Sequence, residues 1–203
     1  TQGSLTADLG ILRVGQTSNR GTANGQFTVG DGVQLDTQST NVGVGSAATG
    51  ELVFVDNFTG SFTSDTVNLQ RGLLDFGNNT LTIDSGGNIL ISTFNLAGGT
   101  LQGDTVDFDP ATGTFNFTSG TLAVNTLNGT LAQLGGTLTP GDSTGITTVN
   151  GDYDLSSAGT IEIDLNGVGT AGVDFDQIDV NGGVNVNADV CTGAALSVVL
   201  GYT

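Results

Sequence analysis

Apolar residues two positions apart recur from one end of the 203-residue chain to the other. The pairs include Leu12/Val14, Phe27/Val29, Val42/Val44, Leu52/Phe54, Val67/Leu69, Leu81/Ile83, Ile89/Ile91, Phe115/Phe117, Leu122/Val124, Ile161/Ile163, Val184/Val186 and Val198/Leu200. Alternation of this period turns one side of a β-strand toward a core. Clusters of Gly, Asn, Asp and Thr follow almost every pair and leave no window long enough for a helix. The pattern therefore predicts an all-β fold built from many short strands.

Repeated phrases distinguish two all-β architectures. The tripeptide Gly-Thr-Leu returns within residues 98–108, 119–129 and 128–141. An antiparallel β-sandwich is compatible with turn signals at this spacing and is the alternative. Recurring equivalent positions favour a parallel β-solenoid, or β-helix, in which stacked coils bring Asn and Thr side chains into hydrogen-bonded ladders. With roughly 20 residues in a coil and a rise of about 4.8 Å, we expect about ten coils and a rod of roughly 50 Å.

A single solenoid is expected over residues 1–203. Residues 1–139 carry irregular short-coil repeats, whereas residues 140–203 alternate over longer stretches, notably 161–165 and 173–180. We therefore expect coils with longer strands in the second segment. The sequence leaves open whether the chain continues beyond residue 203.

The segment from about Gly135 to Val186 has a recognisable order of motifs. It reads GGTLTPGDSTG, then TTVNGDY, GTIEIDL and FDQIDVNGGVNV. This order resembles the pattern that closes many bacterial autotransporter passenger domains and related Gly/Thr/Asn-rich surface proteins. The resemblance implies a right-handed parallel β-helix exported to the cell surface. It does not imply an enzyme, because the motifs shared by the family are turns and strands of the scaffold.

The charge balance narrows the choice of partners. The chain has 3 Lys+Arg against 20 Asp+Glu, which gives a formal net charge of -17. Nucleic acids and anionic membrane surfaces both bind through Lys and Arg, so neither is an expected partner. No apolar run approaches the roughly 20 residues of a membrane span, so we expect no membrane insertion. An acidic, self-repelling surface is typical of a soluble extracellular or cell-surface protein.

The chain contains few residues of the types that act in catalysis. The chain has no His, which excludes Ser-His-Asp and Cys-His catalysis, and its three basic residues, Arg13, Arg20 and Arg71, are scattered. The chain has no Lys or His to abstract a proton for a uronate lyase and no Trp to stack against the sugar for a glycosidase. The lone Cys191 cannot form an internal disulfide and is either a buried small residue, a link to a partner or a reactive thiol. We therefore predict that the protein is not an enzyme, that it has no catalytic residue and that it binds no organic cofactor.

Two kinds of site remain as hypotheses. Paired acids alternate at Asp107/Asp109, at Asp152/Asp154 and at Asp174/Asp176 with Asp179, and oxygen ligands of this kind suit Ca²⁺. The best calcium candidate is the set Asp174, Asp176 and Asp179. Four Asn-x-Ser/Thr triplets are candidate glycosylation sites, at Asn57, Asn78, Asn116 and Asn128.

The ends of the repeat suggest a function. A solenoid exposes backbone groups and apolar interior at its terminal coils unless they are capped. The chain enters the repeat at Leu9 and Ile11 and leaves it at Leu196, Val198 and Leu200, with no capping pattern at either place. The leading hypothesis is a secreted or surface structural subunit that self-associates through these residues into a filament or matrix. The alternative is an adhesin that binds glycans or a host surface; a carbohydrate-active enzyme is a third reading.

Overall fold

The computed structural model describes residues 5–17, 21–83, 86–141, 143–186 and 194–201. These residues form strands and connecting turns, and no helix long and apolar enough to cross a membrane occurs among them. The strands are β1 (Leu5–Gln16), β2 (Ala23–Val29), β3 (Val33–Val44), β4 (Ala48–Phe54), β5 (Ser61–Leu69), β6 (Gly72–Asp75), β7 (Thr80–Ile83), β8 (Ile89–Phe108), β9 (Thr114–Asn128), β10 (Leu131–Gln133), β11 (Gly136–Leu138), β12 (Ile146–Asn150), β13 (Tyr153–Leu155), β14 (Gly159–Leu165), β15 (Gln177–Val180), β16 (Val184–Val186) and β17 (Ala195–Leu200).

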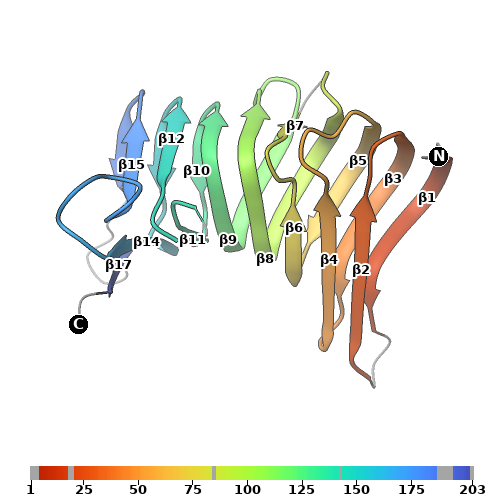
Figure 1. Cartoon of the computed structure of the whole chain (residues 1–203), viewed down its shortest axis with the longest axis horizontal. Helices are drawn as coiled ribbons and strands as arrows, with labels where there is room; N and C mark the ends of the chain where they lie inside the picture. The colour runs from red at the N-terminus through yellow and green to blue at the C-terminus, as the bar shows by residue number, and fades with distance from the viewer. Residues whose placement is uncertain (1–4, 18–20, 84–85, 142, 187–193, 202–203) are drawn as a thin grey trace.

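Parallel pairing joins each strand to its equivalent one coil away, so the predicted β-solenoid is confirmed (Figure 1). The first face contains β1, β3, β5, the start of β8, the start of β9, β10, β13 and β16. The second face contains β2, β4, β6, the middle of β8 and of β9, β11, β14 and β17. The third contains the end of β8, the end of β9, β12 and β15. Strand β7 pairs with both the start and the end of β8, with register shifts between the pairs.

The coils are longer and fewer than expected. Successive equivalent asparagines lie 27 residues apart in the first half of the chain, 21 or 22 residues apart in its middle and 31 residues apart near its end. Eight strands stack on each of the first two faces, so the chain makes fewer turns than the ten expected. At a rise of about 4.8 Å for each turn, the seven spacings between these strands make the stack roughly 35 Å long instead of roughly 50 Å.

Strand lengths also differ from the expectation. The longest strands, β8 with 20 residues and β9 with 15, lie before residue 139, whereas β12 to β17 contain 3 to 7 residues each. The alternating stretch at 173–180 folds only partly as a strand. Its first part closes a turn instead, since the Asn166 amide donates to the Asp174 carbonyl at 2.7 Å and the Gly172 amide to the Phe175 carbonyl at 2.7 Å.

Columns of apolar side chains fill the interior. On the second face, one column continues through eight strands; its members are Phe27, Leu52, Leu74, Leu101, Leu122, Leu138, Ile161 and Leu196. On the first face, the equivalent column consists of Val14, Val42, Leu69, Leu96, Phe117, Gln133, Leu155 and Val186. In each column, the second to the sixth members are fully buried. Each buried apolar side chain contributes about 1.5–3 kcal/mol to stability.

Gln133 is the one polar member of these columns, and its hydrogen bonds explain why it is tolerated. Its amide nitrogen donates to the carbonyls of Gly136 at 2.9 Å and Thr160 at 3.0 Å, and its amide oxygen accepts from the Tyr153 hydroxyl at 2.6 Å. Burial raises the pKa of that hydroxyl, so the phenol stays protonated and remains a donor. A buried amide with all these partners stabilises one packing arrangement.

Asparagine ladders follow the outside of the stack, as the repeated phrases predicted. The Nδ2 atom of Asn68 donates to Asn41 Oδ1 at 3.0 Å, Asn95 donates to Asn68 at 2.8 Å and Asn116 donates to Asn95 at 2.8 Å. A second ladder joins Asn128, Asn150 and Asn181, with bonds of 2.8 and 2.7 Å. Each inner amide both accepts and donates, so the ladder satisfies its members only when the coils are in register.

A column of glycines precedes the apolar column on the second face and accounts for the Gly-Thr-Leu phrases. It contains Gly25, Gly50, Gly72, Gly99, Gly120, Gly136 and Gly159. At Gly120, φ is +87° and a Cβ atom would lie 2.5 Å from the Gly99 carbonyl oxygen. The corner between the first and second faces is therefore too close to the preceding coil for a side chain.

We expect Gly120→Ala to lower the free energy of unfolding by at least about 1–2 kcal/mol, because alanine pays the cost of positive φ and clashes with backbone. Gly30→Ala is the matched control, since no atom lies within 4 Å of its Cβ position and its φ is not positive. Urea unfolding followed by circular dichroism measures both. Equal stability of the two variants would contradict the glycine-column argument.

We expect Asn95→Ala to lower the free energy of unfolding by about 1–3 kcal/mol, because it removes two ladder hydrogen bonds. The control is Asn125→Ala, which removes a single exposed bond of 3.0 Å to Asp104. The same urea titration compares them. A loss at Asn95 no larger than that at Asn125 would show that the ladder does not stabilise the stack.

Candidate functional site

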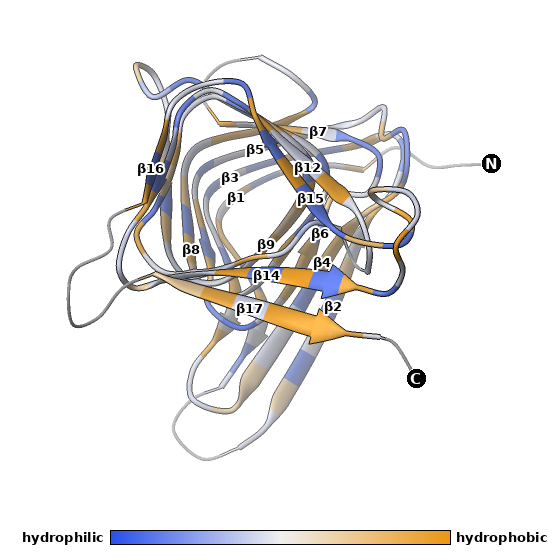
Figure 2. Ribbon diagram, turned by 90° about the vertical axis from the view of Figure 1, so that its left-hand side faces the viewer, coloured by the Kyte–Doolittle hydropathy of each residue, from blue (hydrophilic) through white to orange (hydrophobic). Residues whose placement is uncertain are grey.

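The C-terminal end of the stack exposes residues that belong to the interior columns. Strands β15, β16 and β17 pair with β12, β13 and β14 on one edge, and no described strand pairs with the other edge. Val186 lies beside the buried Leu155, and Leu196 continues the column of Leu138 and Ile161. Leu196 is nevertheless 67% exposed. Figure 2 shows β17 as a largely hydrophobic strand at this end.

The same holds for the other apolar residues of the last coil. Val184 neighbours the buried Tyr153 in register, and Val198 and Leu200 lie on the same inward-facing side of β17 as Leu196. Val198 is 46% exposed, and Leu200 is as exposed as Leu196. These side chains occupy core positions of the fold, and within the described residues no further coil covers them.

The N-terminal end offers the complementary edge. Strand β1 pairs only with β3, and β2 pairs only with β4, among the described residues. Leu9 lies beside the buried Thr37 and packs against the core, whereas Ile11 lies beside Ser39 in an outward-facing row and is about half exposed. Of the five residues predicted to mediate self-association, Leu9, Leu196, Val198 and Leu200 thus face inward and Ile11 does not.

The sequence missed the other inward residues of the end coils. Val14, Phe27, Val184 and Val186 belong to the same alternating pairs, but alternation alone does not reveal which strands lie at an end of the stack. That information comes only from the pairing of strands far apart in the sequence.

The three aspartates predicted to bind calcium are held separately. Asp174 Oδ2 accepts from the Thr170 amide at 2.6 Å, and Asp179 Oδ1 accepts from the Gln177 side chain. Asp176 Oδ1 accepts from the Gly145 amide at 2.8 Å, and its Oδ2 accepts from the Asp164 amide at 2.8 Å. Within the described part of the chain, no group of three or more carboxylates is arranged to hold a metal ion. The geometry therefore gives calcium binding no support at this position.

One aspartate of each of the two other acid pairs likewise accepts a hydrogen bond from the backbone. Asp109 Oδ1 accepts from the Ala111 amide at 2.8 Å, and Asp152 Oδ1 accepts from the Gly183 amide at 2.7 Å. Such bonds are typical of turn aspartates, which stabilise loops by accepting from nearby amides.

Asp176 has a structural role that the sequence did not indicate. It connects the turn at Gly145, strand β14 and the entry to β15, and its side chain is buried. Burial raises the pKa of this carboxyl, although the two backbone hydrogen bonds act in the opposite direction and the nearby Asp164 carboxylate adds to the increase.

The four glycosylation candidates occupy two different environments. Asn57 and Asn78 lie exposed in turns, and Asn57 has a positive φ of 55°. Asn116 and Asn128 are ladder members, and Asn116 uses its Nδ2 atom, the atom to which a glycan would attach, to donate to Asn95. A glycan on Asn116 would displace a ladder bond, whereas Asn128 takes part in its ladder through Oδ1, as the acceptor from Asn150. Cys191 and Arg20 lie outside the described residues.

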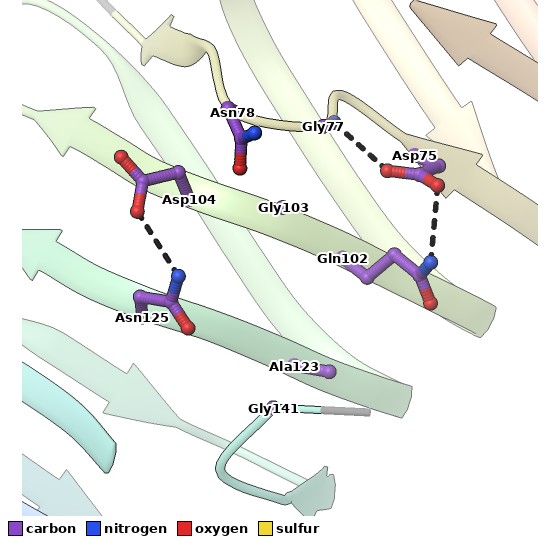
Figure 3. A pocket seen from close by; sticks show the side chains of 9 residues that line it. All are labelled: Asp75, Gly77, Asn78, Gln102, Gly103, Asp104, Ala123, Asn125 and Gly141. Atoms are coloured by element: carbon purple, nitrogen blue, oxygen red, sulfur yellow. Dashed lines mark hydrogen bonds between the residues drawn. The ribbon is translucent and has the colours of Figure 1, made fainter. Parts of the chain in front are cut away.

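A shallow polar groove crosses strands β6, β8 and β9 on the outside of the stack (Figure 3). Its volume is about 250 Å³, and its lining residues are Asp75, Gly77, Asn78, Gln102, Gly103, Asp104, Ala123, Asn125 and Gly141. Gln102 donates to Asp75 at 3.1 Å and Asn125 donates to Asp104 at 3.0 Å. Carboxylate and amide groups at successive coils can hydrogen-bond to hydroxyl groups of a sugar.

Comparisons with known proteins add no identification: no protein-family model matches the chain, and neither curated proteins nor solved structures provide a match.

The raised pKa of Asp176 predicts a pH dependence. Since the folded state holds this proton more tightly than the unfolded state does, the contribution of Asp176 to stability is complete below about pH 3.8 and decreases as the pH rises toward the folded pKa. We therefore expect the free energy of unfolding of the wild type to fall, relative to that of Asp176→Asn, as the pH rises over that interval. Urea unfolding at several pH values measures it, and Asp154→Asn, at an exposed carboxylate, controls for the loss of one charge. If the free energy of unfolding of the wild type instead rose relative to that of Asp176→Asn with increasing pH, the prediction would be contradicted.

Proposed function

We propose that this protein is an extracellular or cell-surface structural subunit whose solenoids associate end to end into a filament or matrix. The observation that supports this most directly is the exposure of inward-column residues at the C-terminal end, where Val186 and Leu196 extend buried columns without being covered themselves. Apolar surface at an unpaired strand edge favours association with another strand.

Two further features are in keeping with this role. The stack is stabilised by repeated contacts between neighbouring coils, so a second copy can add coils of the same kind. The similarity of residues 135–186 to autotransporter passenger domains supports an extracellular location and a scaffold without catalysis.

Glycan binding by a monomer is the second candidate. The polar groove of Asp75, Gln102, Asp104 and Asn125 favours it, because its side chains suit neutral sugar hydroxyls. The two functions separate by experiment, since end-to-end association needs no sugar and leaves the groove free.

We expect the wild-type chain to form concentration-dependent oligomers and Val198→Asp to weaken association at least tenfold, because the carboxylate would enter an apolar interface. The matched control is Val199→Asp on the same strand, where the side chain is 45% exposed but lies beside Asp164 in an outward row. Sedimentation velocity and negative-stain microscopy measure the distribution of species.

Salt provides an independent check of the same proposal. Because the subunits carry a formal charge of -17, raising the ionic strength should strengthen their association. A wild-type chain that stays monomeric at high salt and high concentration, or an identical effect of the two valine substitutions, would overturn the proposal. A monomer that binds a neutral oligosaccharide would then favour the second candidate.

A further inference from the structure

The two ends of the stack match each other in register on two faces. Each of the eight-residue columns begins on the first coil and ends on the last: one runs from Val14 to Val186, the other from Phe27 to Leu196. We propose, resting on the proposed function, that β16 of one copy pairs in parallel with β1 of a second copy while β17 pairs with β2. In this register Val186 lies opposite Val14, and Leu196 lies opposite Phe27.

The side-chain pattern fits this register on both strands. On the first face, Val184 comes opposite Leu12, and both belong to inward rows. On the second face, Val198 comes opposite Val29, which is buried beside Phe54. A shift of one residue on either face would place an outward polar side chain opposite an inward apolar one, because the side-chain period of a strand is two.

Backbone geometry lets only part of each terminal strand pair. In this register residues 195–198 of β17 lie opposite residues 26–29 of β2, whereas Val199 and Leu200 lie beyond the end of β2. Strand β16 spans three residues and covers only the part of β1 near Val14, which leaves the start of β1 outside the contact. The interface is therefore small, and we expect it to depend strongly on protein concentration and salt.

Charge complementarity selects this orientation over others. Arg13 is exposed on β1, next to Val14, and stands beside Asn41 at the top of the first asparagine ladder. At the other end, Asn185 lies beside Asp154 in the outward row. In the proposed register Arg13 of the second copy lies opposite Asn185 and about two coil spacings, or roughly 10 Å, from the Asp154 backbone. An arginine side chain reaches a carboxylate over this separation, and two acidic C-terminal ends could only repel each other.

Disulfide trapping tests the register directly. Thr28 and Ser197 would lie opposite each other on outward rows, with Cα atoms roughly 5 Å apart, which a disulfide can bridge. In a Cys191→Ser background, the double variant Thr28→Cys/Ser197→Cys should form a ladder of reductant-sensitive oligomers under mild oxidation. The control Thr28→Cys/Val199→Cys places the thiols two residues out of register, with Cα atoms roughly 8 Å apart, and should crosslink at least fivefold less.

A charge exchange tests the orientation. Arg13→Asp should weaken association at least fivefold, and the double variant Arg13→Asp/Asp154→Arg should restore it, because the attraction between the two ends is re-formed with opposite signs. Sedimentation velocity at low salt measures both. A double variant as weak as the single one would overturn the contact between these ends.

The outcomes separate the register from the function itself. Association of the wild type with equal or stronger crosslinking of the Val199 control would reject the register while the end-to-end function stands. A chain that remains monomeric in sedimentation, with neither double-cysteine variant forming oligomers, would reject both.

Discussion

In-register parallel pairing of each coil with the next is the constraint on which the rest of this structure depends. Because equivalent residues lie one strand spacing apart, a property needed at one coil is needed at all of them. An asparagine that stacks on Asn68 must itself accept from the next amide, and a glycine at the corner must leave room for the carbonyl of the coil before it. The repeated phrases of the sequence are the direct result of that requirement.

The same constraint distributes stability along the stack. Interior columns such as the one from Phe27 to Leu196 gain their burial from the coils on either side, so a middle member is fully buried and a terminal member is not. The last coil therefore has the composition of a core and the environment of a surface. Connecting the two ends of different copies is the arrangement that removes this conflict without any new type of contact.

Acidity would work against the proposed association and would give it a direction. Most carboxylates of the last coils face outward or accept backbone hydrogen bonds in turns, as Asp152 and Asp174 do, and their repulsion disfavours contact between like ends. Arg13 at the opposite end is one of three basic residues in the chain. In the proposed assembly, a lopsided charge distribution of this kind would favour a head-to-tail arrangement over a two-fold symmetric one.

The sequence by itself determined the all-β class, the solenoid and the presence of ladders, because strand alternation and stacked polar residues leave a periodic record in the chain. It did not determine the coil length, since the distance from Asn68 to Asn95 depends on how many faces a coil contains, and turn signals do not count faces. It proposed a cluster from Asp174, Asp176 and Asp179, yet loop geometry directs these carboxylates to separate amides. It pointed to Leu196 and Val198 but could not separate them from the outward Ile11, because inward or outward orientation follows from pairing with strands that are distant in sequence and near only in the folded chain.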